Sequence, residues 1–102
     1  MKKIISDNME QIKTLCQAHH VETLFSFGSV ETEKFNENTS DIDLLVSFKP
    51  MNSVDYAENY FSMAEDLEIL FHKPVDLITE RTLSNPYFIQ TINKTKTLIY
   101  GY

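Results

Sequence analysis

The stretch FGSVETEKFNENTSDIDLLVSF, residues 27–48, places two aspartates, Asp41 and Asp43, in a run that otherwise has the composition of a β-strand. Aspartate is depleted in strands because its short side chain competes for backbone hydrogen bonds and packs poorly on a pleated surface. Side chains alternate across a strand, so both carboxylates are expected on one face. The other face, expected in the core, carries Ile42, Leu44, Val46 and Phe48.

Hydrophobic patterning predicts the elements on either side of this stretch. Helices are expected over 6–20, with Ser6 as its cap, over 53–71, with Ser53 as its cap, and over 84–95. Strands are expected over 21–27, 41–48 and 74–79, and a final strand or extended tail over 97–102. This order predicts a small α/β or α+β fold, one domain over residues 1–102, in which helices cover a mixed sheet.

Composition and charge narrow the classes of function. Nine Lys and Arg against fifteen Asp and Glu give a formal charge of −6, which repels a phosphate backbone and makes nucleic acid an unlikely partner. The single Cys16 forms no internal disulfide, and no apolar run approaches the ~20 residues that cross a bilayer. We therefore expect a cytoplasmic protein that does not interact with membranes.

A chain of 102 residues makes one modest core and has little room for a deep substrate pocket of its own. An elaborate site is therefore expected to need a partner chain, and oligomer formation is left open. The polar loop between the first two strands, with a short helix beginning at Ser29, is the other region expected to serve a site.

Two neighbouring carboxylates suggest a metal site. Without a bound cation the two carboxylates repel one another, which raises the pKa of one of the carboxyl groups. A divalent cation between them removes that cost and suits their hard oxygens. A third acid, Asp76, lies in the apolar strand PVDLIT and joins the other two if that strand is adjacent to theirs. Three carboxylates can hold two Mg²⁺ ions about 3.5 to 4 Å apart, which clamp the attacking and leaving oxygens of a phosphoryl displacement.

Gly28 and Ser29 follow the first strand at a position suited to phosphate binding. A missing Cβ lets the backbone approach a phosphate, and free N–H groups donate to it. A Gly-Ser pair and an Asp-x-Asp motif are each common alone. Their order, with a third strand aspartate after a long helix, is far more specific.

With these motifs, FGS, SDIDLLV and VDLIT, the chain resembles the polymerase β-like nucleotidyltransferases, in particular the minimal nucleotidyltransferases of HEPN–MNT toxin–antitoxin pairs. The resemblance implies that Asp41, Asp43 and Asp76 bind two Mg²⁺ ions and act in catalysis, and that Gly28 and Ser29 hold the nucleotide phosphates. It implies transfer of a nucleoside monophosphate, AMP from ATP, to a tyrosine hydroxyl of a partner HEPN toxin.

The loop after Gly-Ser departs from the family pattern. Val30, Glu31, Thr32 and Glu33 stand where members often have an aromatic or Arg residue and then Ala-Arg-Gly, and eleven residues rather than ten precede Asp41. Acidic side chains there would repel a triphosphate, and Lys34 is the one local compensation. The alternative function is therefore a non-catalytic antitoxin or binding module with a vestigial nucleotide site.

Other notable side chains have ordinary structural explanations. His19, His20 and His72 are expected at helix ends, where imidazole favours the helix dipole. The aromatic residues of the long helix, Tyr56, Tyr60 and Phe61, are expected to serve core or helix packing.

Overall fold

The computed structural model describes residues 2–28 and 41–101. Its sheet has the strand order β3-β2-β1-β4 and consists of β1 (Val21–Phe27), β2 (Ile42–Phe48), β3 (Val75–Thr79) and β4 (Thr97–Tyr100). Strand β1 pairs antiparallel with β2 and β4, whereas β2 and β3 are parallel. The mixed sheet confirms the expected fold class and supplies the strand order that the sequence left open.

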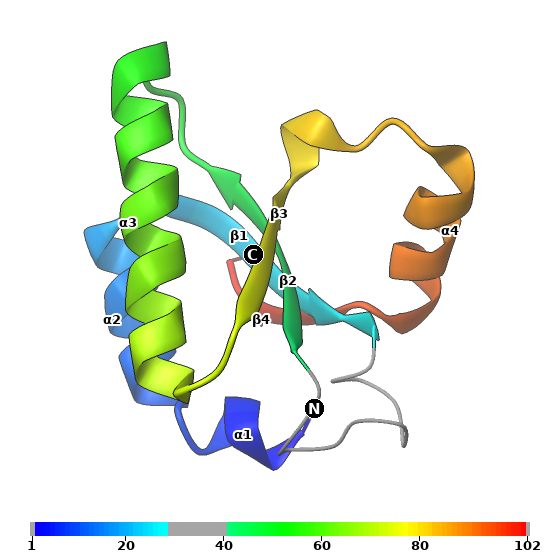
Figure 1. Ribbon diagram of the computed structural model, residues 1–102, viewed down its shortest axis with the longest axis horizontal. Helices are drawn as coiled ribbons and strands as arrows, with labels where there is room; N and C mark the ends of the chain where they lie inside the picture. The colour runs from blue at the N-terminus through cyan, green and yellow to red at the C-terminus, as the bar shows by residue number, and fades with distance from the viewer. Residues whose placement is uncertain (1, 29–40, 102) are drawn as a thin grey trace.

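Helices cover both faces of this sheet. They are α1 (Lys3–Ser6), α2 (Met9–Ala18), α3 (Ser53–Phe71), the 3-10 helix η2 (Glu80–Thr82) and α4 (Pro86–Thr95). Figure 1 shows α2 and α3 together on one side of the sheet and α4 on the other. Helix α3 is the crossover between the parallel strands β2 and β3. No helix in the described ranges is both long and apolar enough to cross a membrane.

The core lies mainly between the sheet and the helix pair α2 and α3. Ile42, Leu44 and Val46 of β2 are fully buried there, packed with α3 residues such as Leu67, which confirms the predicted inward face. The opposite face of β2 is covered as well, because Leu45 packs with Phe27 and with α4. Asp43 lies on this same face of β2, two residues before Leu45.

The long helix has its predicted bounds, whereas one predicted helix start and one predicted cap are wrong. Ser6 ends α1 instead of capping a helix over 6–20, and α2 begins at Met9. The side chain of Asn8 donates to the carbonyl oxygen of Ile4 at 2.8 Å and so takes the acceptor that its own backbone N–H would use in a continuous helix. For α3, the cap is Asn52, whose Oδ1 accepts from the Asp55 N–H at 2.8 Å.

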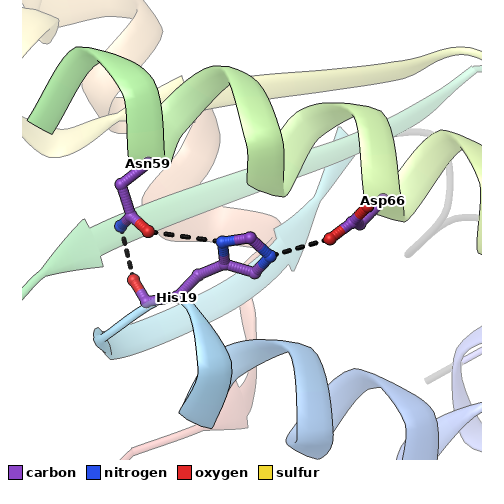
Figure 2. A network of polar contacts seen from close by, with 3 residues as sticks. All are labelled: His19, Asn59 and Asp66. Carbon is purple, nitrogen blue, oxygen red and sulfur yellow. Dashed lines mark hydrogen bonds and ion pairs between the residues drawn. The ribbon is translucent and has the colours of Figure 1, made fainter. Parts of the chain in front are cut away.

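A polar network fastens the end of α2 to α3 (Figure 2). The buried imidazole of His19 lies 2.8 Å from Asp66 Oδ2 through Nε2 and 3.3 Å from Asn59 Oδ1 through Nδ1. Asn59 also donates its amide to the His19 carbonyl. His19 therefore joins two helices, which is more than the predicted interaction with a helix dipole.

Candidate active site

Strand pairing places the candidate acids in one row at the end of the sheet. In this register Asp43 of β2 lies opposite Phe27 of β1 on one side and opposite Asp76 of β3 on the other. Asp41 directly precedes β2, two residues before Asp43, and shares its strand parity. Strand β2 lies between β1 and β3, and residues far apart in the sequence therefore meet at this end of the sheet.

The electrostatics of Asp43 reflect this crowding. Burial, followed by the negative charges of Asp76 and Asp41, raises the pKa of the Asp43 carboxyl from 3.8 to about 6. Asp41 and Asp76 are themselves exposed to solvent. An ionised Asp43 is therefore destabilised in the ligand-free protein, which is the condition that a divalent cation relieves.

The donor set fits a hard divalent ion, although it is not assembled into a finished metal centre. Among the described residues, no group of three or more His, Cys, Asp or Glu side chains is gathered closely enough to hold a metal ion. Mg²⁺ needs only one or two carboxylates, because waters and substrate phosphates complete its octahedron. Asp43, flanked by Asp41 and Asp76, meets that requirement.

Gly28 directly follows β1 and closes the site on the side of Asp43. Its φ is +69°, and a Cβ on it would lie 2.6 Å from Asp43 Oδ2, so a larger residue would displace the carboxylate. The expected free donor is not found at Gly28, because its N–H donates to Thr95 Oγ1 at 3.1 Å. Gly28 therefore provides space beside the carboxylate. Ser29, the acidic loop residues, Lys34 and the helix expected from Ser29 lie outside the described residues.

Thr95 is a site residue that the sequence analysis missed. It is the last residue of α4, and its hydroxyl accepts from Gly28 N–H while donating to the Thr91 carbonyl oxygen at 3.3 Å. A threonine at a helix end has many ordinary uses, so only the packing of α4 against the sheet identifies this role. The bond fixes the start of the Gly-Ser loop to a helix 67 residues further along the chain.

Tyr60 of α3 borders the site from the other side. Its hydroxyl donates to the Leu77 carbonyl oxygen of β3, and burial, then the charges of Asp76 and Tyr56, raise the pKa of this phenol. Tyr60 thus stays protonated and holds α3 close to the strand that carries Asp76. The expectation of a packing role is correct for Tyr60, whereas Phe61 is 68% exposed and packs in no core.

Comparison with known proteins identifies the family of this chain. A family model described as the nucleotidyltransferase domain matches residues 9–99, which is most of the chain. The chain belongs to the nucleotidyltransferase family. A member from Methanocaldococcus jannaschii, named as a proposed protein adenylyltransferase, is 35% identical over 88 residues, covering 86% of this chain and 84% of the relative.

Solved nucleotidyltransferase structures share the fold. A proposed minimal nucleotidyltransferase has a TM-score of 0.74 at 26% identity, with 95% of both chains covered. A chain of the complex between a tri-AMPylated HEPN toxin of Shewanella oneidensis and its MNT antitoxin has a TM-score of 0.65 at 20% identity, covering 95% of this chain and 72% of that one. These matches confirm the resemblance to minimal nucleotidyltransferases that the sequence motifs predicted.

Proposed function

We propose that this nucleotidyltransferase moves AMP from ATP to a tyrosine hydroxyl of a partner HEPN-domain protein, using Mg²⁺. The observation that carries the proposal is the row of Asp43 and Asp76 on adjacent strands, with Asp41 and the side-chain-free Gly28 next to it. The relative named as a protein adenylyltransferase and the AMPylated toxin in a structural neighbour support the choice of AMP and of a protein acceptor.

The roles of the acids follow from their positions. Asp41 and Asp43 would hold the metal against the triphosphate, and Asp76, on the outer strand, would face the acceptor. Metal ions, when bound, supply charge stabilisation for the attacking and leaving oxygens. The tyrosine oxygen forms a bond to the α-phosphorus, the bond from that phosphorus to the bridging oxygen breaks, and pyrophosphate leaves with that electron pair.

The tyrosine proton needs an acceptor as the new bond forms. Asp76 is exposed and lies beside Asp43, so its carboxylate can reach a hydroxyl brought to the edge of the sheet. Gly28, held by Thr95, leaves room for the Asp43 carboxylate to take its position in the site. Each of these roles belongs to a side chain or backbone position that the fold places at one end of the sheet.

The test is intact-mass analysis of a HEPN-domain protein that binds this chain, after incubation with ATP, Mg²⁺ and this chain. We expect the partner to gain one or more AMP units with the wild type and none with Asp43→Asn or Asp76→Asn. If wild type and variants bind and neutralise the partner equally and neither adds mass, the proposed transfer is wrong and the chain is a non-catalytic antitoxin.

A further inference from the structure

A groove runs between α3 and the outer strand β3, and one end of it is the candidate active site. Its volume is about 500 Å³, and its walls include Tyr56, Ala57, Tyr60 and Phe61 of α3 and Asp76 and Thr79 of β3. Because Asp76 belongs both to this groove and to the row of acids, a molecule in the groove would touch the site at the position assigned to the acceptor.

The α3 wall of the groove carries apolar side chains that no described residue covers. Phe61 is 68% exposed and Ala57 is exposed as well. The stripe continues beyond the groove to Val54, also 68% exposed, in a helical i, i+3, i+7 pattern. The ring of Phe61 stands edge-on to Tyr60 with centroids 5.2 Å apart. Contiguous exposed apolar surface of this kind is typical of an interaction site.

The edge of β3 is not open for pairing with a strand of another chain. The Val75 N–H donates to Glu68 Oε2 at 2.9 Å, and the Leu77 carbonyl oxygen accepts from the Tyr60 hydroxyl. Side chains of α3 thus occupy backbone groups that an added strand would need. An occupant of the groove must therefore bind through its side chains.

The charge beside the groove indicates the sign of that occupant. Asp76 is the charged residue among the described walls of the groove, and Glu68 of α3 lies at its Val75 end. The guanidinium of Arg81 is engaged over the Tyr56 ring. The whole chain carries a formal charge of −6. Electrostatic complementarity selects against an acidic partner segment and favours a basic one. It also disfavours a nucleotide without a metal in the same groove.

We propose that this groove docks the acceptor-bearing segment of the protein substrate. In this arrangement apolar side chains of the segment pack on Phe61 and Tyr60, its Lys or Arg residues lie near Glu68, and its tyrosine hydroxyl reaches Asp76. The chemistry of the tyrosine rests on the proposed function, but the docking does not, because it depends on the shape and charge of the groove alone.

The experiment compares Phe61→Ala with Ile69→Ala. Ile69 is 62% exposed on the same helix, about 80° round the helix axis from Phe61, and does not line the groove. For each variant, the dissociation constant for the HEPN-domain protein is measured together with the AMP added to it. Mg²⁺–ATP binding is measured separately by thermal shift.

Phe61→Ala is expected to raise the partner dissociation constant by about tenfold or more, as for an aromatic anchor in an interface, and to slow AMP addition. Ile69→Ala should leave both within about twofold, and neither variant should change the Mg²⁺–ATP shift. Partner binding should also weaken as the salt concentration rises.

The outcomes separate the two proposals. If the wild type adds no AMP but Phe61→Ala still weakens partner binding selectively, the transfer proposal fails and the docking site stands. If the wild type adds AMP and both variants bind and modify the partner equally, the groove is not the docking site. Loss of the Mg²⁺–ATP shift in Phe61→Ala would overturn the inference as well, because the groove would then hold the nucleobase.

Discussion

Asp43 and Gly28 constrain each other at the level of single residues. The carboxylate of Asp43 occupies the space that a side chain at position 28 would fill, and its negative charge is opposed by burial and by two neighbouring acids. A group in this condition weakens the ligand-free fold. The cation of the proposed function would offset this cost, because the same crowding that raises the pKa of Asp43 also concentrates negative potential at one point.

Asp43→Asn should stabilise the chelator-treated protein at pH 8. The Asp43 pKa is about 6 in the fold against 3.8 unperturbed, so the native state binds more protons between those values and stability falls as the pH rises through them. The full shift corresponds to about 3 kcal/mol, which solvent screening at this half-exposed position reduces to about 1 kcal/mol.

Urea unfolding from pH 4 to pH 8 measures this effect. The advantage of Asp43→Asn should be complete above about pH 7 and should fall to a small fraction near pH 4, where the native carboxyl is protonated and the unfolded one is partly protonated. Glu65→Gln, which changes an exposed acid of α3, is the control and should show no such profile. A constant difference at every pH would mean that charge at Asp43 is not the cause.

At the level of elements, α4 acts as a support for the start of the Gly-Ser loop. It packs on the face of the sheet that carries Asp43, through Ile92 with Phe27 and Leu45. Its cap, Asn85, accepts from the N–H groups of Tyr87 and Phe88 and fixes where the helix begins. The last residue, Thr95, therefore reaches Gly28, and the position of Gly28 depends on a helix that contributes none of the proposed metal ligands.

Thr95→Val should weaken Mg²⁺–ATP binding and lower the free energy of unfolding by about 1 to 3 kcal/mol, because the Gly28 N–H loses its acceptor. Thr91→Val is the matched control, since the Thr91 hydroxyl donates to the Tyr87 carbonyl oxygen one turn earlier and has no bond to Gly28 among those described. Thr95→Ser should restore binding. Equal loss of nucleotide affinity in Thr91→Val would show that α4 stability, and not the bond to Gly28, is responsible.

At the level of the whole molecule, the site joins segments that are distant in the chain. The end of β1, the start of β2 and the start of β3 meet at one end of the sheet, while α3 links β2 to β3 on the opposite face. A ligand that bridges these strand ends stabilises the entire fold, because unfolding any of them removes part of its site. The formal charge of −6 opposes the approach of a free nucleotide, and the Mg²⁺ of the proposed function would offset that repulsion.

Mg²⁺–ATP at one hundred times its dissociation constant should stabilise the protein by about 2.7 kcal/mol, whereas ATP with a chelator should give almost nothing. Thermal melts of the wild type and of Asp76→Asn measure this, with Mg²⁺ alone as the control. A shift of equal size in the presence of chelator would show that the nucleotide binds without the aspartates and their metal.

The sequence alone determined the element types, the inward face of β2 and the set of candidate acids, because strand alternation and the depletion of aspartate in strands are local properties. It could not determine that Asp76 lies opposite Asp43, since the parallel pairing of β2 and β3 is a long-range choice. The sequence pattern predicted that Gly28 lacks a side chain so that a phosphate can approach its backbone. In the structure, the group that comes close enough to exclude a Cβ is the Asp43 carboxylate.

Tertiary structure also decided the roles of Thr95 and Phe61. Thr95 acquires its bond to Gly28 only when α4 packs on the sheet, and Phe61, which contacts the ring of Tyr60, still leaves 68% of its surface exposed. The break at Asn8 came from a side chain competing for one carbonyl, which periodicity does not register. Local chemistry thus set which residues could act, and packing between distant segments set which of them meet.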